Sequence, residues 1–438
     1  MGTCSHTNAQ TWASVGSPGF SAAQADYTSI AIDPSGTPYI VFWDSLNNLR
    51  ATVMKYNGTS WVNVGTPGFS ADTAIFTSIA IDHSGTPYVV FVSPVDGPVT
   101  VMKFNGSSWV NIGSPSFSAG PSLGTTIAID ATGTPYVAYT DWGNHGKATV
   151  MKFIGTSWVP VGSAGFSDSN TVYTSIALDN TGAPYVAYMD YGHNQKETVM
   201  KFNGTNWVNV GSAGFSDSAA WGGNLAIDAS NTPYVVYRDA ENGKADVMKF
   251  NGTGWVYVGS PEFSSGAAWF TSIAINSTGT PYVICQDNGL AYKATVMKYN
   301  GTSWTAVGSA AFSAGVASTT SIAIDASGSV YAGYSDYSLG HKAVVMKFAS
   351  ATGISNTVLS SGNGISTYPN PATGILSVLT PMPIGSLSLQ DISGKQLTTK
   401  QVTTTLTSFD IHTLPRGIYF AVWNDGTGQK SVQKVIVE

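Results

Sequence analysis

A repeat of 48 or 49 residues constrains the fold of this chain more than any other feature. Each copy carries a tryptophan that opens a W-x-x-V/I-G strand, a turn proline in six of seven copies, and a Met-Lys pair. The marker tryptophans are Trp12, Trp61, Trp109, Trp158, Trp207, Trp255 and Trp304. Self-similarity at such a period indicates an array of small units, none of which buries its apolar faces alone.

One unit, residues 174–211, shows what each copy is built from. The segments TSIALD, PYVAY, ETVMKF and WVNVG are rich in β-branched and aromatic residues and are separated by polar or Gly-containing turns. Such segments are typical of strands, and the Asn203-Gly204 pair between the last two predicts a tight hairpin. The unit therefore predicts a four-stranded antiparallel meander, which is the blade of a β-propeller.

Seven copies predict seven blades over residues 1–348, in an all-β chain. The chain starts on a Trp strand, Trp12–Gly16, whereas the last repeat, Ser321–Phe348, lacks one. We therefore predict that the first strand pairs with Val344–Phe348 and closes the ring. The tight turns then lie on one face of the ring, and the longer, more variable loops lie on the other, where we expect a ligand to bind.

Charge and apolar patterning exclude several classes of protein. The 438 residues carry a net charge of −6, and the chain contains no basic run, so we expect no nucleic-acid partner. No apolar run reaches the roughly 20 residues that span a bilayer. The first ten residues, MGTCSHTNAQ, lack a signal-peptide pattern, so a secreted protein would have lost its signal peptide. Two cysteines, Cys4 and Cys285, make no disulfide framework, and whether they pair is open.

The repeat stops after Phe348. Residues 349–366 are small, polar and aperiodic, and we interpret them as a linker. Residues 367–438 alternate apolar and polar residues between turns such as DISGK and LPRG. This second pattern predicts a small Ig-like β-sandwich.

The motifs of this tail resemble the type A C-terminal sorting domain of cargo exported by the type IX secretion system of Bacteroidota. The matching residues are Tyr368, Pro369, Asn370 and Pro371 of YPNP, Asp391, Gly394 and Lys395 of D-x-x-G-K, Leu414, Pro415, Gly417 and Tyr419 of L-P-x-G-x-Y, and Lys434 in the basic-apolar end. The resemblance implies recognition by the secretion machinery at the outer membrane and a secreted or outer-surface location. Whether the tail is cleaved or anchored is open.

The candidate ligand-binding residues are aromatic and acidic. Trp43, Trp142, Tyr191 and Tyr337 lie beside recurring loop aspartates, including Asp141 and Asp190; Tyr27, Phe76, Tyr173, Phe270, Trp221 and Trp269 lie at the start of the innermost strands. Aromatic rings stack on the C–H faces of sugars while carboxylates accept from their hydroxyls, so this set favours glycan binding. The same aromatics could instead pack between blades. The aspartates could instead pair with a basic residue six positions later, such as Lys147 or Lys196.

No catalytic motif and no cofactor signature is present, and we expect neither a cofactor nor a metal. His145, His193 and His341 belong to blades three, four and seven, too far apart around a ring to share zinc. We therefore expect a monomeric propeller that binds glycan or a surface protein, rather than an enzyme. Two alternatives stay open, namely a polysaccharide hydrolase or lyase, and a structural surface-layer protein.

Overall fold

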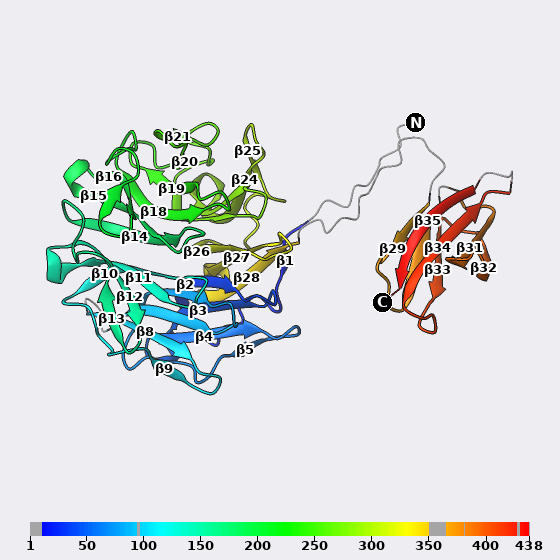
Figure 1. Ribbon diagram of the computed structural model, residues 1–438, viewed down its shortest axis with the longest axis horizontal. Helices are drawn as coiled ribbons and strands as arrows, with labels where there is room; N and C mark the ends of the chain where they lie inside the picture. The colour runs from blue at the N-terminus through cyan, green and yellow to red at the C-terminus, as the bar shows by residue number, and fades with distance from the viewer. Residues whose placement is uncertain (1–10, 94–96, 350–364, 381, 427–429, 438) are drawn as a thin grey trace. The chain divides into compact units, whose positions relative to one another are not determined.

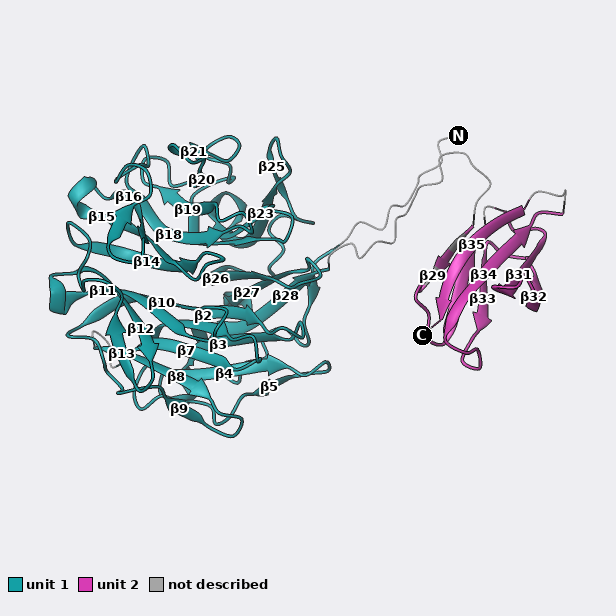
Figure 2. Cartoon of the chain, in the orientation of Figure 1, with its two compact units in different colours: residues 1–352 teal, residues 353–438 magenta. Residues whose placement is uncertain are grey.

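The computed structural model describes residues 11–93, 97–349, 365–380, 382–426 and 430–437. The chain divides into two compact units, residues 1–352 and residues 353–438 (Figure 2). Most of the predicted linker, and Cys4, lie outside the described residues.

The first unit is a ring of seven four-stranded antiparallel sheets (Figure 1). The innermost strands are β2 (Ala25–Ile32), β6 (Ile75–Ile81), β10 (Ser122–Ile129), β14 (Thr171–Leu178), β18 (Ala220–Ile227), β22 (Ala268–Ile275) and β26 (Ala317–Ile324). The second strands are β3 (Pro38–Asp44), β7 (Pro87–Val92), β11 (Pro135–Asp141), β15 (Pro184–Asp190), β19 (Pro233–Asp239), β23 (Pro281–Asp287) and β27 (Val330–Asp336).

The outer half of each blade is shorter. The third strands are β4 (Arg50–Tyr56), β8 (Val99–Phe104), β12 (Lys147–Ile154), β16 (Lys196–Phe202), β20 (Ala245–Phe250), β24 (Lys293–Tyr299) and β28 (Lys342–Phe348). The outermost strands are β5 (Trp61–Asn63), β9 (Trp109–Asn111), β13 (Ser157–Pro160), β17 (Trp207–Asn209), β21 (Trp255–Tyr257), β25 (Trp304–Ala306) and β1 (Ala13–Ser14). Blades one to seven follow this order, so blade one is β2–β5 and blade seven is β26–β28 with β1.

Among the described residues, short 3-10 turns follow the second strand in five blades. They are η1 (Ser45–Asn47), η2 (Trp142–Asn144), η3 (Tyr191–His193), η4 (Asn288–Leu290) and η5 (Tyr337–Leu339). These turns occupy the longer loops that the sequence predicts on one face. Second-strand residues such as Val186 and Tyr188 are buried, because neighbouring blades cover both faces of the sheet.

The ring closes through the N-terminal strand, as predicted. β1 pairs with β28, with Ala13 opposite Lys347 and Ser14 opposite Met346. The Val15 N–H also donates to the Val345 carbonyl at 2.9 Å. The final blade is therefore completed by the start of the chain, which ties the two ends of the propeller together.

The marker tryptophans hold adjacent blades together. In all seven blades the indole N–H donates to a carbonyl of the preceding blade's outermost segment, at 2.6 to 2.8 Å. The same ring stacks on a phenylalanine, as in Phe20–Trp61 and Phe166–Trp207, with centroids 4.2 and 4.0 Å apart. The repeat therefore encodes a latch between neighbours, and Trp12 makes it to Val307 at the closure.

The second unit is a β-sandwich. One sheet contains β29 (Ser366–Tyr368), β30 (Ile375–Leu379) and β33 (Leu406–Asp410), and the other contains β32 (Gln396–Gln401), β31 (Ser386–Asp391), β34 (Gly417–Asn424) and β35 (Lys430–Val437). Leu376, Leu389, Phe409 and Trp423 are fully buried between them. Over the described part of the chain, no helix has the length and apolarity needed to cross a membrane.

Candidate functional site

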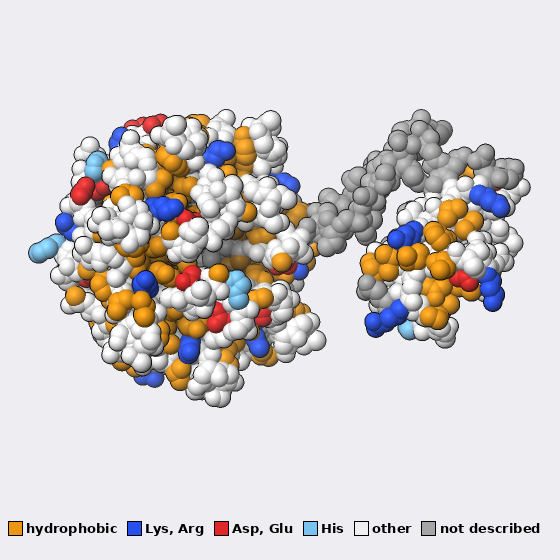
Figure 3. Space-filling view, viewed as in Figure 1, with side chains coloured by type: hydrophobic (Ala, Val, Ile, Leu, Met, Phe, Trp, Pro, Cys, Tyr) orange, Lys and Arg blue, Asp and Glu red, His pale blue; other side chains and the backbone are white. Residues whose placement is uncertain are grey.

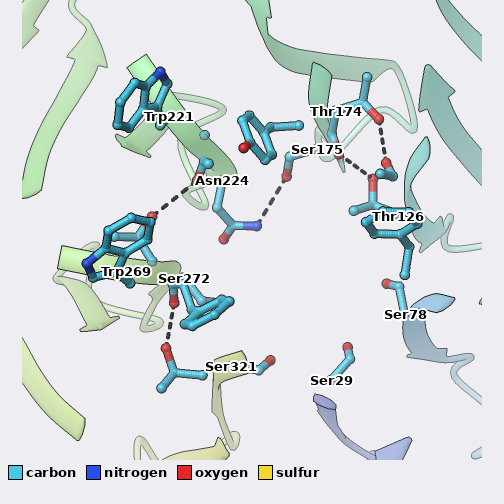
Figure 4. Close-up of a pocket in the computed structure, with 18 of the residues that line it drawn as sticks. Ser29, Ser78, Thr126, Thr174, Ser175, Trp221, Asn224, Trp269, Ser272 and Ser321 are labelled. Atoms are coloured by element: carbon cyan, nitrogen blue, oxygen red, sulfur yellow. Dashed lines mark hydrogen bonds between the residues drawn. The ribbon is translucent and has the colours of Figure 1, made fainter. Parts of the chain in front are cut away.

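The propeller has a pocket of about 520 Å³ at the long-loop end of its central channel. All seven innermost strands contribute to its wall, from Thr28 and Ser29 in blade one to Thr320 and Ser321 in blade seven. Trp221 and Trp269 lie on one side of this central pocket, and Ser78 and Thr126 on the opposite side (Figure 4).

A bulge in each innermost strand shapes the rim of the central pocket. The register of every inner hairpin shifts near its start, and one residue there takes a positive φ. These left-handed residues are Tyr27, Phe76, Gly124, Tyr173, Gly222, Phe270 and Thr319, with φ between 47° and 69°. For an aromatic residue this backbone is uncommon and strained. In six of the seven blades, a hydrogen bond from the following blade to the carbonyl of this residue holds the backbone in place.

The residue after the bulge binds the neighbouring blade. In six blades it is a threonine whose hydroxyl donates to the left-handed residue's carbonyl in the preceding blade, as Thr125 does to Phe76 at 2.7 Å. The next position is polar in every blade, comprising Ser29, Ser78, Thr126, Ser175, Asn224, Ser272 and Ser321. The floor of the central pocket is therefore a ring of neutral hydrogen-bonding groups.

Blades five and six break the symmetry of the ring. Trp221 and Trp269 occupy the position before the bulge, where the other blades have smaller side chains. They are 38% and 43% exposed, and Tyr173 and Phe270 are 49% and 47% exposed. Arg238 on β19 lies against both tryptophan rings, with Cζ 4.2 Å and 3.6 Å from their centroids. This side of the central pocket thus combines aromatic faces with one cation.

Blade five also lacks the threonine latch. Gly223 stands in its place, and a Cβ built there would fall 2.7 Å from Oε2 of Glu197 on β16. Glu197 is fully buried, and neither carboxyl oxygen has a hydrogen-bond partner among the described residues. Burial, and then the charge of Asp190, raise the pKa of Glu197 well above its usual value. Burial therefore favours the protonated form of the carboxyl group behind the Gly223 wall.

Five of the predicted ligand-binding residues line the central pocket, namely Phe76, Tyr173, Trp221, Trp269 and Phe270. Tyr27 lies in the same ring of left-handed residues, in edge-to-face contact with Phe76 at 5.3 Å. The marker tryptophans and their phenylalanine partners pack between blades, and the Tyr27–Phe76 contact also joins two blades, so the packing alternative stays open for the pocket aromatics.

The other predicted aromatics lie away from this pocket. Trp142, Tyr191 and Tyr337 open the 3-10 turns and are 49%, 43% and 47% exposed, whereas Trp43 at the end of β3 is half-buried. None of the four is among the residues that line the central pocket. Their role in binding stays a prediction.

Asp141 and Asp190 are buried caps of the turns η2 and η3. Asp141 accepts from the Gly143 N–H at 3.0 Å and from the Thr149 hydroxyl at 3.0 Å. Asp190 accepts in the same way from Gly192 and Thr198. Both carboxylates are occupied by the turn that follows them.

The alternative that these aspartates form ion pairs with the basic residue six positions on is wrong. Asp141 faces Lys147, and Asp190 faces Lys196, as Cα partners across the hairpin. Within the described ranges, however, no ion pair joins either carboxylate to that lysine. The carboxylates turn toward backbone N–H and threonine donors, since these lie closer inside the buried turn.

The sequence interpretation missed Arg238, Asn224 and Glu197. Each departs from the residue type at its repeat position, which is the signal that could have found them. Glu197, for example, replaces the buried alanine or valine of the other six blades. Among the described residues no three His, Cys, Asp or Glu side chains gather as metal ligands. Cys285 is buried, which raises the pKa of its thiol.

In the tail, Asn370 of YPNP joins the start of the sandwich to its last strand. Its side-chain amide donates to the Lys434 carbonyl at 2.7 Å and accepts from the Ile436 N–H at 2.8 Å. Tyr368 and Pro369 precede it at the end of β29, and the Asn370–Pro371 peptide bond is cis.

The other tail motifs are turns. Asp391 accepts from the N–H groups of Ser393 and Lys395, and Gly394 supplies the positive φ that this turn requires. The Tyr419 hydroxyl donates to the Pro415 carbonyl at 2.7 Å, with Gly417 at the start of β34 between them. The motif residues thus build the sandwich.

Residues 366–438 match the family model described as the secretion system C-terminal sorting domain. The tail is a domain of this family, and the chain is a propeller cargo of the type IX route with a secreted or outer-surface location. No curated protein matches the chain.

Solved structures resemble this chain at low sequence identity, and one of them, with a TM-score above 0.5, shares its fold. The extracellular domain of BT3049 from B. thetaiotaomicron is 10% identical with a TM-score of 0.51, covering 98% of this chain and 57% of that one. PorZ, a surface component of the type IX secretion system of Porphyromonas gingivalis, is 14% identical with a TM-score of 0.49, covering 95% and 60%. This chain therefore spans less than two thirds of either protein. The Aleuria aurantia lectin, solved with Fucalpha1-6GlcNAc, is 15% identical with a TM-score of 0.44, covering 65% and 94%.

Proposed function

We propose that the propeller is a glycan-binding module, which the sorting domain delivers to the cell surface or beyond. The observation that carries this proposal is the composition of the central pocket. Exposed rings such as Tyr173, Trp269 and Phe270 surround a floor of hydroxyl and amide groups. Ser175 and Asn224 bond to each other and to the next inner strand, whereas the hydroxyls of Ser78 and Ser272 make no hydrogen bond within the described part of the chain. Sugars present apolar C–H faces and polar edges, and this arrangement offers a partner to each. A volume of about 520 Å³ suits a short oligosaccharide.

The lining favours binding over hydrolysis. Among the described residues that line the central pocket, there is no Asp or Glu. Glycoside hydrolysis commonly needs two carboxyl groups on either side of the scissile bond. Glu197 is fully buried behind Gly223 and so has no contact with a bound sugar in this conformation.

A glycan array with the full-length protein, followed by calorimetry of the best ligands, tests the proposal. We expect Trp269→Ala to weaken binding on the order of tenfold or more, since a stacked aromatic face is an anchor of such sites. Trp142→Ala is the matched control, because Trp142 is equally exposed but lies on η2 outside the central pocket.

Three outcomes would contradict the proposal. They are failure of the protein to bind any glycan, equal weakening by both tryptophan variants, and turnover of a bound polysaccharide. Turnover would show that the propeller is a hydrolase or lyase.

A further inference from the structure

Arg238 is a buried cation in the wall of the central pocket. It lies on β19 opposite Trp221 of β18, and only 7% of the residue is exposed. The rings of Trp221 and Trp269 contact its guanidinium group, with Cζ to centroid distances of 4.2 and 3.6 Å. At such short distances a guanidinium group stacks with its face toward a ring, which leaves its N–H edge for other partners.

Within the described part of the chain, that edge has no partner. Arg238 forms no hydrogen bond and no ion pair with a described residue, and it is the only basic residue that lines the pocket. Burial lowers the pKa of its guanidinium, which nevertheless stays charged at neutral pH. Buried charges in proteins are normally paired, because an unpaired one loses its hydration without compensation.

The same repeat position behaves differently in other blades. Thr140 in blade three donates to the Thr171 carbonyl of the next blade at 3.1 Å, and Gln286 in blade six donates to the Ala317 carbonyl. Two of the three other polar residues at this position are therefore satisfied by the neighbouring backbone, whereas the buried hydroxyl of Ser335 in blade seven has no hydrogen-bond partner among the described residues. Arg238 instead reaches the pocket, where Ala268 and Trp269 of blade six also contribute to the lining.

We propose that the central pocket takes an acidic glycan and that Arg238 binds its anionic group, a uronate carboxylate or a sulfate ester. This inference rests on the proposed function and adds the chemical class of the ligand. A guanidinium edge matches either anion with two parallel hydrogen bonds, and the flanking tryptophan rings fix its plane before the ligand arrives.

The selectivity for an anion comes from this one residue. The chain has a net charge of −6, and on the face of the molecule that Figure 3 shows, lysine and arginine side chains are scattered singly. No general attraction for polyanions is therefore expected. Binding of an acidic sugar would depend on Arg238 and would be lost with it.

The test compares matched pairs of probes by calorimetry on the full-length protein. One pair is tri-galacturonate and its carboxyl-reduced form, and the other is a sulfated galactan trisaccharide and its desulfated form. We expect wild type to prefer one acidic probe over its neutral form on the order of tenfold or more, as hydrogen bonds to a charged group imply. Whether the uronate or the sulfate pair shows this preference distinguishes the two anions.

Variants assign the preference to Arg238. Arg238→Gln should bind both forms of the preferred pair equally. Trp269→Ala removes a sugar-stacking face and one of the rings that hold Arg238, so it should weaken both forms, and the acidic form more. Arg50→Gln, which changes the other propeller arginine on β4, should keep the wild-type preference. Arg238→Lys keeps the charge without the planar fork, and it should retain a reduced preference even if Arg238→Gln folds poorly.

Equal binding of acidic and neutral forms by wild type would overturn the inference while leaving the glycan-binding proposal intact. An Arg238→Gln protein that folds and still prefers the acidic probe over its neutral form would also overturn the inference and leave the glycan-binding proposal intact. A wild-type protein that binds none of the four probes and no glycan on the array would instead overturn the proposed function, and the inference with it.

Discussion

The guanidinium carbon of Arg238 lies 3.6 Å from the centre of the Trp269 ring, and this contact joins two blades. Arg238 belongs to the second strand of blade five, and Trp269 to the innermost strand of blade six. The most distinctive part of the central pocket is thus built across one blade interface. The other blades supply a nearly uniform ring of small polar groups. Blades five and six therefore supply the side chains that we expect to determine ligand specificity, and the other blades form the scaffold around them.

Glu197 should make the stability of the propeller depend on pH. Its pKa is raised in the folded protein, so the folded state holds a proton that the unfolded chain releases above its ordinary value of 4.5. Its contribution to the free energy of unfolding is therefore most favourable below that pH, and it falls as pH rises through the folded pKa. The loss is at most about 1.4 kcal/mol per pH unit in that window.

Glu197→Gln removes this titration and keeps the shape of the side chain. We expect denaturant unfolding at pH 5 to 8 to show wild type losing stability with rising pH relative to the variant. Parallel pH profiles for the two proteins would show that Glu197 is not held protonated.

Gly223 should tolerate threonine only when Glu197 is shortened. Gly223→Thr alone places Cβ against the Glu197 carboxyl group and should destabilise the propeller. Glu197→Ala with Gly223→Thr restores the pattern of blades six and seven, where Ala294 and Thr320 stand at the repeat positions of Glu197 and Gly223 and Thr320 bonds the preceding blade. A double-mutant cycle should give a favourable coupling of about 1–3 kcal/mol, and additive effects would contradict this packing.

Trp12 should hold the ring closed. Its indole N–H donates to the Val307 carbonyl at 2.7 Å, and its ring stacks on Phe312 at 4.2 Å. Trp12→Ala removes these two contacts and leaves the backbone pairing of β1 with β28. We expect a loss of about 3 kcal/mol in the free energy of unfolding. Trp142→Ala, at an exposed turn, should change it by less than about 0.5 kcal/mol. Equal effects would mean that the closure adds little stability.

Asn370 should hold the last strand of the sorting domain. Asn370→Ala removes the hydrogen bonds to Lys434 and Ile436, worth about 1 kcal/mol each. Hydrogen exchange of β35 in the full-length protein should then speed up. Lys434→Ala is the matched control, because Asn370 bonds only the backbone of that residue, and it should leave exchange near the wild-type rate.

The repeat made the fold predictable in detail. A latch tryptophan, a turn proline and a Met-Lys pair recur in order, so blade number, strand order and the closing strand followed from counting. The outermost strands are shorter than expected. For example, β17 ends at Asn209, and the carbonyl of Val210 after it accepts the indole N–H of Trp255 in the next blade. The YPNP and LPxGxY motifs likewise identified the sorting domain.

The central pocket was only partly predictable. Trp221, Trp269 and Tyr173 stood out as aromatics at the start of inner strands, where a ring places them around the channel. The hydrogen bonds that the loop aspartates accept from the turns after them and from nearby threonines could not be read from the sequence, and their role in ligand binding stays a prediction. Arg238 and Glu197 escaped notice because their meaning depends on contacts between blades, which the spacing within one repeat does not reveal.

The most direct test is a crystal structure of the protein with its best array glycan. We predict a sugar ring against Trp269 in the central pocket, with an anionic group within hydrogen-bonding distance of Arg238. Density for the glycan at the exposed turns around Trp142 or Tyr337, with the central pocket unchanged, would contradict the assignment of this pocket as the binding site.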